Sequence, residues 1–369
     1  MIPGLHQARI WTARIASRLD PVLLGLLLLL MALSLAVLFS ASGGRESVVI
    51  AQGVRFGIGL TAMLAIAQIA PTQLRTWSPW LYLASLGLLA LVPVFGSGRS
   101  GQHWLDLGVF YLQPGELLKL SVPMMLAWLL HRAVLPPTPT VLLAGLALIG
   151  LPTLMIAIQP DLGTAVPVAA SGVLAIFLAG LSWRWIAGLG LAGLASAPLA
   201  WLALKDYQKQ RILTFIDPES DPLGSGWNII QSKIAVGSGG LFGKGWTAGS
   251  QARLEFLPEQ TTDFIFAVLA EEFGLVGVLF ALLLYLAILA RCLWIAAESR
   301  DGFGRLVVGA LGLTFFLYVV LNGGMIAGLL PVVGVPMPLL SFGGTSALAF
   351  LAGFGLVMSV HSHRRLLGH

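Results

Sequence analysis

The chain has 369 residues, of which 57% are hydrophobic and only 10% are charged, and its mean hydropathy is +0.90. These values exclude an ordinary soluble globular protein and are typical of a protein that crosses a membrane several times. The net charge of +5 does not indicate a nucleic-acid binder, because the basic residues are scattered between apolar stretches, and the single cysteine, Cys292, excludes an internal disulfide.

Apolar stretches long enough to cross a bilayer recur along the whole chain, each about 20 residues long. They predict an all-α polytopic membrane protein with about ten transmembrane helices in a single domain, 1–369. The amphipathic segment after the third span is expected to lie in the membrane interface. A long polar, turn-rich loop, at about 205–262, separates the seventh and eighth spans. The predicted spans are about 21–41, 48–70, 77–95, 115–131, 140–158, 163–181, 184–204, 263–290, 305–329 and 342–360.

The distribution of basic residues predicts the orientation of the chain. Ten crossings place both termini on one side, and basic residues are enriched on the cytoplasmic side of membrane proteins. Eleven basic residues fall on the side of the termini, against two, Arg45 and Arg99, in short loops of the other side. Both termini are therefore expected in the cytoplasm and the loop 205–262 outside. A bond-forming reaction on the outer side of the membrane has no direct access to cytoplasmic ATP or nucleotide sugars. It must therefore use a substrate that arrives already activated.

Asp263 stands where the long polar loop ends and the eighth span begins. Its carboxylate is expected at the boundary between water and hydrocarbon, within reach of a substrate that is part lipid and part sugar. The structural alternative is an N-cap, because Asp is among the residues that favour this position. Glu271 and Glu272 follow about two turns further along the same helix, and carboxylates at that depth usually mark a functional interior.

Further charged residues fall inside the predicted spans. Glu116 and Lys119 are three residues apart, so they share a helix face, and both lie near the outer end of the fourth span. Asp161 lies in the tight connection between the fifth and sixth spans, and Arg55 lies about one turn into the second. These residues are expected to line a polar cavity that opens outward. The structural alternative is a salt bridge that locks helices together.

Three of these carboxylates could also form a metal site. If Glu116, Asp161 and Asp263 converge, their oxygen atoms suit Mg²⁺ or Mn²⁺, which prefer carboxylate, water and phosphate ligands. The sequence contains no closely spaced ligand motif such as CxxC or HExxH. A divalent cation is therefore predicted only on the condition that the three side chains meet.

Two glycine-rich segments lie outside the predicted helices. Residues 236–250 place six glycines around Lys244, with Lys233 nearby, and are predicted to cradle a pyrophosphate, because glycines let backbone N–H groups approach an anion. The alternative is an ordinary turn-rich surface loop. Residues 322–346 contain three prolines and paired glycines, and irregular backbone at membrane depth predicts a cavity wall, with a tight outer turn as the alternative.

Five motifs together carry a resemblance to a known family. They are QPGELLK at 113–119, QPDLGTA at 159–165, GWNIIQSKIAVGSGGLFGKGW at 226–246, FLPEQTTDFIFAVLAEE at 256–272 and GVPMPLLSFGGTS at 334–346. With them the chain resembles the SEDS family (shape, elongation, division and sporulation), and in particular its RodA branch, over nearly its whole length.

The resemblance implies a peptidoglycan glycosyltransferase of the bacterial cytoplasmic membrane, with its active site facing outward. Such an enzyme polymerises lipid II into nascent glycan strands and works with a class B penicillin-binding protein in the elongation machinery. Asp263 falls on the essential catalytic aspartate of the family. The glutamate and lysine of the family's fourth helix fall on Glu116 and Lys119, and the aspartate of its QPDLGT turn falls on Asp161. Two departures are visible: Gly115, where serine is common, and Phe342, where tyrosine is common. Glycine lacks the hydroxyl of serine, and phenylalanine lacks the hydroxyl of tyrosine, so neither residue can form the corresponding side-chain hydrogen bond.

The mechanism expected from these residues is inverting glycosyl transfer. Asp263 would accept the proton of a sugar hydroxyl as a general base, and undecaprenyl pyrophosphate would leave. Its charge would be stabilised by some of Arg55, Lys119, Lys233, Lys244 and a divalent cation. A lipid II flippase that makes no bond is the main alternative, because ten helices with intramembrane charge fit it too. A scaffold that only recruits the transpeptidase is a third.

Overall fold

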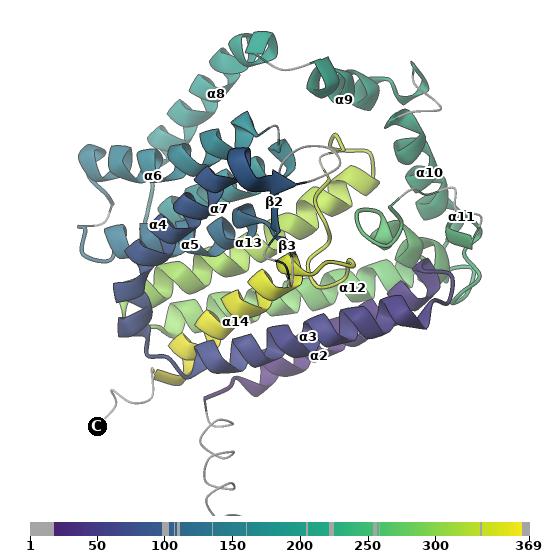
Figure 1. The fold of residues 1–369 in the computed structure, drawn as a ribbon, viewed down its shortest axis with the longest axis horizontal. Coiled ribbons are helices and arrows are strands. Elements are labelled where there is room, and N and C mark those ends of the chain that lie inside the picture. The colour runs from purple at the N-terminus through teal and green to yellow at the C-terminus, as the bar shows by residue number, and fades with distance from the viewer. Residues whose placement is uncertain are drawn as a thin grey trace, which may run out of the picture.

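The computed structural model describes residues 18–97, 103–106, 108, 111–134, 136–159, 161–203, 206–220, 225–253, 257, 259–332 and 334–363. Within these residues, ten long helices coincide with the ten predicted spans (Figure 1). Seven of them, α2, α3, α4, α6, α12, α13 and α14, are long and apolar enough to cross a membrane, and α7 is a shorter apolar helix. The ten are α2 (Pro21–Ala41), α3 (Glu46–Ala67), α4 (Pro71–Phe95), α5 (Pro114–Leu130), α6 (Pro139–Ile158), α7 (Leu162–Leu178), α8 (Trp183–Ala203), α12 (Ile265–Glu298), α13 (Gly302–Ile326) and α14 (Thr345–His363).

Local capping explains where several of these helices begin. Asp20 caps α2, with Pro21 at the first helical position, and its carboxylate accepts a hydrogen bond from the Leu23 N–H at 2.7 Å. The same carboxylate forms an ion pair with Arg291 of α12, whose Nε lies 3.1 Å from Oδ1. One aspartate therefore both starts the first span and ties it to the eighth.

Glycines allow the closest helix contacts in the bundle. In Figure 1, α14 lies beside α3. A Cβ on Gly355 would lie 2.8 Å from the backbone oxygen of Met63, so the two helices can approach this closely only without a side chain there. The same is true of Gly312 in α13, where a Cβ would lie 2.7 Å from Cβ of Cys292 in α12. Cys292 is fully buried and serves in packing.

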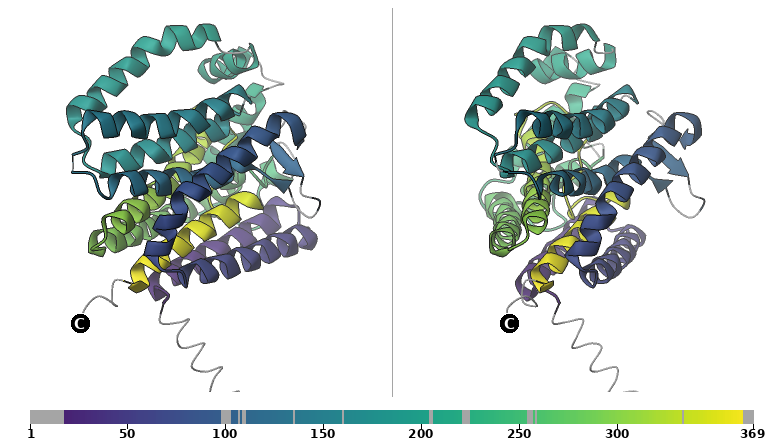
Figure 2. Two further views of the ribbon diagram at one scale, coloured as in Figure 1. Left: turned by 60° about the vertical axis from the view of Figure 1, so that its left-hand side comes forward. Right: turned by 90° about the vertical axis from the view of Figure 1, so that its left-hand side faces the viewer.

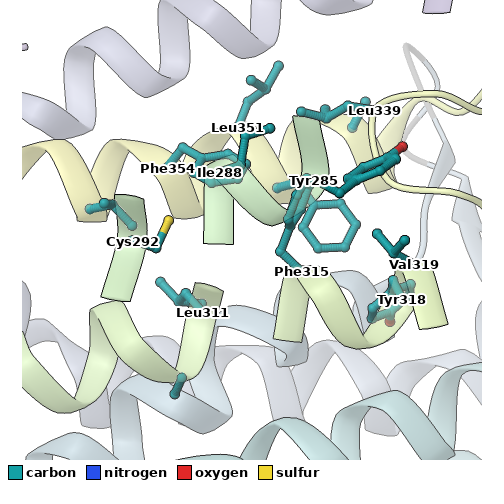
Figure 3. Packing of buried hydrophobic residues seen from close by; sticks show 14 of the residues in the cluster. Tyr285, Ile288, Cys292, Leu311, Phe315, Tyr318, Val319, Leu339, Leu351 and Phe354 are labelled. Atoms are coloured by element: carbon teal, nitrogen blue, oxygen red, sulfur yellow. The ribbon is translucent and has the colours of Figure 1, made fainter. Parts of the chain in front are cut away.

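An aromatic cluster fills the interior between α12, α13 and α14 (Figure 3). Ring centroids of Phe315 and Phe354 are 5.0 Å apart, and those of Tyr318 and Phe350 are 5.2 Å apart, in edge-to-face arrangements. The Tyr285 hydroxyl donates a hydrogen bond to the Pro338 carbonyl at 2.8 Å. The core is thereby fastened to the loop that precedes α14.

The long loop 205–262 is more regular than its polar, turn-rich sequence predicts. It contains α9 (Asp206–Ile216), the 3₁₀ helix η1 (Pro218–Ser220), α10 (Ser225–Ser238) and the short α11 (Ser250–Arg253). Together with α8, the helices α9 and α10 arch around one side of the bundle (Figures 1 and 2). The helices of the loop could not be recognised as spans in the sequence, because short amphipathic helices on a surface carry too little hydrophobicity.

The segment after α4, expected in the membrane interface, contains strands as well. β1 (Gly96–Ser97), β2 (Trp104–Asp106) and β3 (Tyr111–Leu112) form a small antiparallel sheet in the order β1-β2-β3. Gly96 pairs with Leu105, and Leu105 pairs with Leu112. The sheet connects the end of α4 to the start of α5 and contributes side chains to the site below.

Candidate functional site

A pocket of about 280 Å³ lies where α5, α7 and α14 begin and α13 ends. Its walls include Glu116, Asp161 and Asp263, so three carboxylates from three separate stretches of sequence share one space. The convergence that sequence alone left open is therefore present. The lining residues are His103, Trp104, Gln113, Glu116, Asp161, Gly163, Thr164, Thr262, Asp263, Tyr318, Gly334, Val335, Pro336, Phe342, Gly343, Gly344, Thr345 and Ser346.

Asp263 lies in a turn immediately before α12. The N-cap position belongs to Phe264, one residue later, so the capping alternative for Asp263 was wrong. The turn is held from α13 by the fully buried Asn322, whose Nδ2 donates to the Asp263 carbonyl at 2.8 Å and to the Val335 carbonyl at 2.7 Å. The aspartate backbone is thereby fixed against both α13 and the loop that follows it.

The loop between α13 and α14 forms the opposite wall. The Ser341 hydroxyl donates to the Thr262 carbonyl at 2.5 Å, and the Phe342 N–H donates to the Thr261 carbonyl at 2.8 Å. Gly334 has φ +71°, and a Cβ there would lie 3.5 Å from Oδ2 of Asp263. A side chain at Gly334 would be strained and would intrude on the carboxylate. The prediction of a cavity wall in 322–346 is therefore confirmed.

Glu116 and Lys119 form a buried ion pair within α5. The carboxylate of Glu116 lines the pocket, and the Lys119 ammonium lies behind it, 4.3 Å from the centre of the Tyr318 ring. Lys119 Nζ also donates to Ser346 Oγ at 3.3 Å, at the start of α14. The salt bridge of the structural alternative is therefore present, within one helix. The lysine also connects the glutamate to the first turn of α14.

Asp161 is held by two donors. One carboxylate oxygen caps α7 by accepting from the Thr164 N–H at 3.0 Å, and the other accepts from Gln113 Nε2 at 2.9 Å. The same Gln113 amide donates to Thr164 Oγ1 at 3.0 Å. Asp161 is thus a rigid part of the pocket wall.

Arg55 of α3 reaches the site indirectly. Its guanidinium stacks 4.2 Å from the centre of the Phe342 ring, which lines the pocket. One turn earlier, the fully buried Gln52 accepts a hydrogen bond from the Gly343 N–H and donates one to the Ser341 carbonyl, each at 3.4 Å. The face of α3 that carries both residues therefore supports the loop before α14.

The predicted metal site does not fit this arrangement. Within the part of the chain that the structure describes, no group of three or more His, Cys, Asp or Glu side chains is placed to hold a metal ion. Glu116 is paired with Lys119, and both oxygens of Asp161 already accept hydrogen bonds. The pocket is therefore lined by Glu116, Asp161 and Asp263, but the three carboxylates do not form a common set of metal ligands.

Comparison with known proteins identifies the family. The family model of FtsW, RodA and SpoVE, described as "Cell cycle protein", matches residues 18–366. The chain belongs to this family. It is 50% identical over 351 residues to peptidoglycan glycosyltransferase MrdB of Escherichia coli K12, covering 95% of each chain, and 37% identical over 314 residues to stage V sporulation protein E of Bacillus subtilis, covering 84% of this chain and 85% of that protein.

Solved structures agree with this placement in the FtsW, RodA and SpoVE family. The crystal structure of Thermus thermophilus rod shape determining protein RodA superimposes with a TM-score of 0.71 at 32% identity, over 94% of this chain and 97% of that one. A chain from a structure named "Structural coordination of polymerization and crosslinking by a peptidoglycan synthase complex" gives 0.82 at 35% identity, over 94% and 98%. The resemblance to the RodA branch is therefore confirmed.

Lys244 does not line the pocket that contains Asp263, and it interacts with other residues. Its Nζ lies 2.6 Å from Oε1 of the fully buried Glu271 and donates to Ser250 Oγ at 2.8 Å. Glu271 also accepts from the N–H groups of Ser250 and Gln251. The charge predicted to bind pyrophosphate thus neutralises a buried carboxylate, and the structure does not support that assignment.

The glycines around Lys244 serve close packing against α12. This helix is interrupted at Gly274, which has φ 64°, and the backbone of the glycine loop supplies hydrogen bonds at the break. The Leu275 N–H donates to Gly240 O at 3.0 Å, and the Lys244 N–H donates to Glu271 O at 3.0 Å. A Cβ on Gly243 would overlap the Glu272 carbonyl. The structure does not support the predicted pyrophosphate cradle, because Gly239 and Gly243 pack against the backbone of α12 and Lys244 is paired with Glu271.

Two further predicted positions also lie outside the pocket lining. Lys233 of α10 is exposed, and its ammonium packs near Gly328, where a Cβ would lie 2.7 Å from Nζ. Glu272 is buried beside α2 and accepts a hydrogen bond from the Ser40 hydroxyl. Glu271 and Glu272 therefore hold the outer loop and α2 to α12, which corrects the expectation that they line a functional interior.

Several pocket residues were not singled out from the sequence. His103 and Trp104 enter from the small sheet, Gln113 and Thr164 orient Asp161, and Asn322 holds the Asp263 turn. Asn322 could have been recognised in the sequence, because a polar residue four positions before the end of an apolar helix often has a functional role. The sheet residues carried none, because a short polar segment between spans does not reveal toward which side it folds.

Proposed function

We propose that this chain is a peptidoglycan glycosyltransferase and that the Asp263 pocket is where it polymerises lipid II. The observation that carries the proposal is the position of Asp263 in a pocket shared with Glu116 and Asp161, at the end of the bundle where α12 begins. The relatives named peptidoglycan glycosyltransferase MrdB, in Escherichia coli and Helicobacter pylori, support the same activity.

The proposed reaction is an inverting transfer. The Asp263 carboxylate accepts the proton from the 4-hydroxyl of the GlcNAc on the acceptor lipid II. The activated oxygen forms a bond to the anomeric carbon of the terminal MurNAc of the growing strand. The bond from that carbon to the pyrophosphate breaks at the same time. Undecaprenyl pyrophosphate leaves with the electron pair of the broken bond. General base catalysis of this kind contributes about 10²- to 10⁴-fold to the rate.

The first turn of α14 is the group best placed to stabilise the leaving pyrophosphate. Gly343, Gly344, Thr345 and Ser346 line the pocket, and the N-terminal N–H groups of a helix favour a bound anion. Lys119 donates to Ser346 from behind this turn. This helix start takes the role that the sequence had suggested for the loop around Lys244.

Arg55 adds a positive charge near the same turn. A Cβ on Gly344 would lie 3.6 Å from the Arg55 Nε, so the guanidinium flanks the glycines that line the pocket. The proposed division of roles is therefore a base at Asp263, a rigid wall at Asp161, and anion stabilisation by the start of α14 with Arg55 beside it.

A polymerisation assay separates an enzyme from a flippase or a scaffold. The purified chain, together with a class B penicillin-binding protein as its proposed partner, is incubated with labelled lipid II. The wild-type chain should produce glycan strands, and Asp263→Asn should lower the rate by about 10²-fold or more, because the amide cannot accept the proton. A flippase or a scaffold would produce no strands from either protein.

Glu259→Gln is the matched control for this assay. Glu259 is an exposed carboxylate four residues before Asp263, and it accepts a hydrogen bond from the Thr262 hydroxyl at 3.0 Å, which a glutamine oxygen can still accept. Its activity should equal that of the wild-type chain. An equal loss in both variants would mean that the turn, and not the Asp263 carboxylate, is required.

The proposed topology places both termini in the cytoplasm and the Asp263 pocket outside, in the bacterial cytoplasmic membrane. Single-cysteine labelling tests it, because Cys292 is buried and gives little background. Phe242→Cys, at a position 80% exposed in the outer loop, should react with a membrane-impermeant reagent added to intact cells. Arg300→Cys, at the other end of the bundle, should react only after the membrane is permeabilised.

A further inference from the structure

A second cavity, of about 360 Å³, lies at the end of the bundle opposite to the Asp263 pocket. It is formed by the start of α4, the turn between α12 and α13, and the last turn of α14. The Asp263 pocket lies at the other end of α13, whose 25 residues correspond to about 37 Å of helix. The second cavity is lined by Ala70, Pro71, Thr72, Arg75, Ser299, Arg300, Asp301, Gly304, Val360 and His363.

Positive charge predominates around this cavity. Arg75 and Arg300 contribute two guanidinium groups, and Asp301 is the one acidic residue among the lining residues. The Asp301 carboxylate is shared between two tasks: it caps α13 through the Gly304 N–H at 3.4 Å and lies 3.7 Å from Arg75. The cavity therefore retains a net attraction for an anion.

The start of α4 reinforces this charge, whereas the start of α13 is capped by the Asp301 carboxylate. Both α4 and α13 begin at the cavity, and each has 25 residues. No side chain caps the start of α4, where Ala70 occupies the N-cap position and Pro71 follows. The partial positive charge of this helix end is thus available to a ligand, in addition to the two arginines.

Exposed tryptophans place the cavity at the depth of lipid headgroups. On α4, Trp77 and Trp80 are 47% and 71% exposed, two and five residues beyond Arg75, and on α12 Trp294 is 59% exposed, six residues before Arg300. Tryptophan is enriched at the boundary between hydrocarbon and headgroups. The walls at Ala70, Pro71 and Val360 are apolar and suit the carbon skeleton of a lipid.

We propose that this cavity binds the phosphate group of an anionic phospholipid, such as phosphatidylglycerol, from the leaflet opposite to the Asp263 pocket. Arg75 and Arg300 donate hydrogen bonds to the phosphate oxygens. The start of α4 adds the Thr72 N–H and the partial positive charge of the helix end, because Pro71 has no N–H and the Gln73 N–H already donates to the Ala70 carbonyl. The apolar walls receive the glycerol backbone. This site is separate from the one that holds the polyprenyl pyrophosphate substrate.

Phospholipid retention measures the proposed binding directly. The full-length chain is purified in detergent, exposed to mixed micelles of equal amounts of phosphatidylglycerol and phosphatidylcholine, and examined by native mass spectrometry. The wild-type chain should retain phosphatidylglycerol preferentially. Arg75→Gln with Arg300→Gln should lower this preference about tenfold or more, because each basic side chain near a membrane surface adds to the attraction for anionic lipid.

Arg305→Gln is the matched control. Arg305 is an exposed basic residue near the start of α13 that does not line the cavity, so its removal changes the net charge of this end without changing the site. Its preference for phosphatidylglycerol should stay at the wild-type value. An equal loss in Arg305→Gln would mean that only general surface charge attracts the lipid, and it would overturn the proposal.

Three further measurements test the proposal. Arg300→Gln alone leaves the pair of Arg75 and Asp301 intact, so it preserves the fold and should still weaken retention; an unchanged value would refute the site. Free glycerol 3-phosphate should not displace the lipid, and displacement at equal concentration would assign the cavity to a soluble phosphate. Asp263→Asn should retain the lipid normally, so a failure of the polymerase proposal would leave this result unaffected.

Discussion

The Asp263 pocket and the glycine loop around Lys244 have similar residues but opposite structural roles. Both combine carboxylates, a lysine and several glycines near the start of α12. In the loop, Glu271 and Lys244 satisfy one another, and the backbone of 239–249 fills the break of α12 at Gly274. In the pocket, carboxylates surround about 280 Å³ of open space. The comparison teaches that a polar motif marks a site only where it leaves room for a ligand.

Glu271→Gln should give the largest effect on stability. The amide oxygen of the glutamine can take the place of Oε1, but it is a weaker acceptor than the carboxylate, its NH₂ group faces the Gln251 N–H that Oε2 accepts, and Lys244 loses its counter-charge. Breaking a buried pair in this way costs about 4 kcal/mol. The melting temperature in detergent should fall strongly, while polymerisation per folded molecule stays near the wild-type rate. A loss of rate at an unchanged melting temperature would make Glu271 part of the active site.

Gly243→Ala tests the close packing of the loop. Its Cβ would overlap the Glu272 carbonyl, and the backbone at φ +79° disfavours any side chain, so the free energy of unfolding should fall by about 3 kcal/mol. Gly237→Ala is the control, because that position has open space and no positive φ. Thermal unfolding of both variants decides the matter. Equal melting temperatures would mean that the loop does not dock on α12 in this way.

Gly115→Ser tests the pocket side of the comparison. A Cβ at Gly115 would overlap the Thr164 methyl group, which accounts for glycine at a position where the family commonly has serine. Overpacking here should cost about 2 kcal/mol and lower the polymerisation rate, because Thr164 orients Asp161. Adding Thr164→Ser, which removes the methyl group and keeps the hydroxyl, should restore both quantities. A double variant as impaired as Gly115→Ser would exclude this contact as the cause.

Lys244→Met should lower stability without lowering activity. Glu271 keeps its hydrogen bonds from Ser250 and Gln251 but becomes a buried carboxylate without its counter-charge, so the free energy of unfolding should fall by about 3 kcal/mol. The rate of polymerisation and the KM for lipid II should stay unchanged. If the rate fell as steeply as in Asp263→Asn while the protein kept its melting temperature, Lys244 would have to contact the pyrophosphate after all.

The ten helices could be predicted to within a few residues at most of their ends. For example, α2 spans Pro21–Ala41 as expected, because Asp20 and Pro21 define its start and hydrocarbon thickness defines its length. The end of α12, at Glu298 rather than about 290, was less accurate. The start of α4, at Pro71 rather than about 77, was missed by a similar margin, since a polar first turn does not register as hydrophobic. The helices of the outer loop were missed for the same reason: α10, Ser225–Ser238, is neither long nor apolar enough to count as a span.

The candidate site was predictable in its carboxylates and in two of its cations, Arg55 and Lys119, but not in the other two. Glu116, Asp161 and Asp263 each stood at a span end, where a charge is costly and calls for a reason, and the structure places all three in one pocket. Lys244 and Lys233 lie in a polar loop, where a lysine pays no desolvation penalty and therefore gives no sign of a function. Glu271, the partner of Lys244, and Gly328, beside which Lys233 packs, belong to other segments of the chain and could not be inferred from neighbouring residues.

The sequence by itself determined the ten long apolar helices, most of their approximate ends and the family, because hydrophobicity and motif spacing are properties of each segment alone. Only the tertiary structure decided which charges face a common space and which neutralise one another. That outcome depends on how each helix is rotated and where it crosses its neighbours, and close contacts such as that between Gly243 and α12 set those positions.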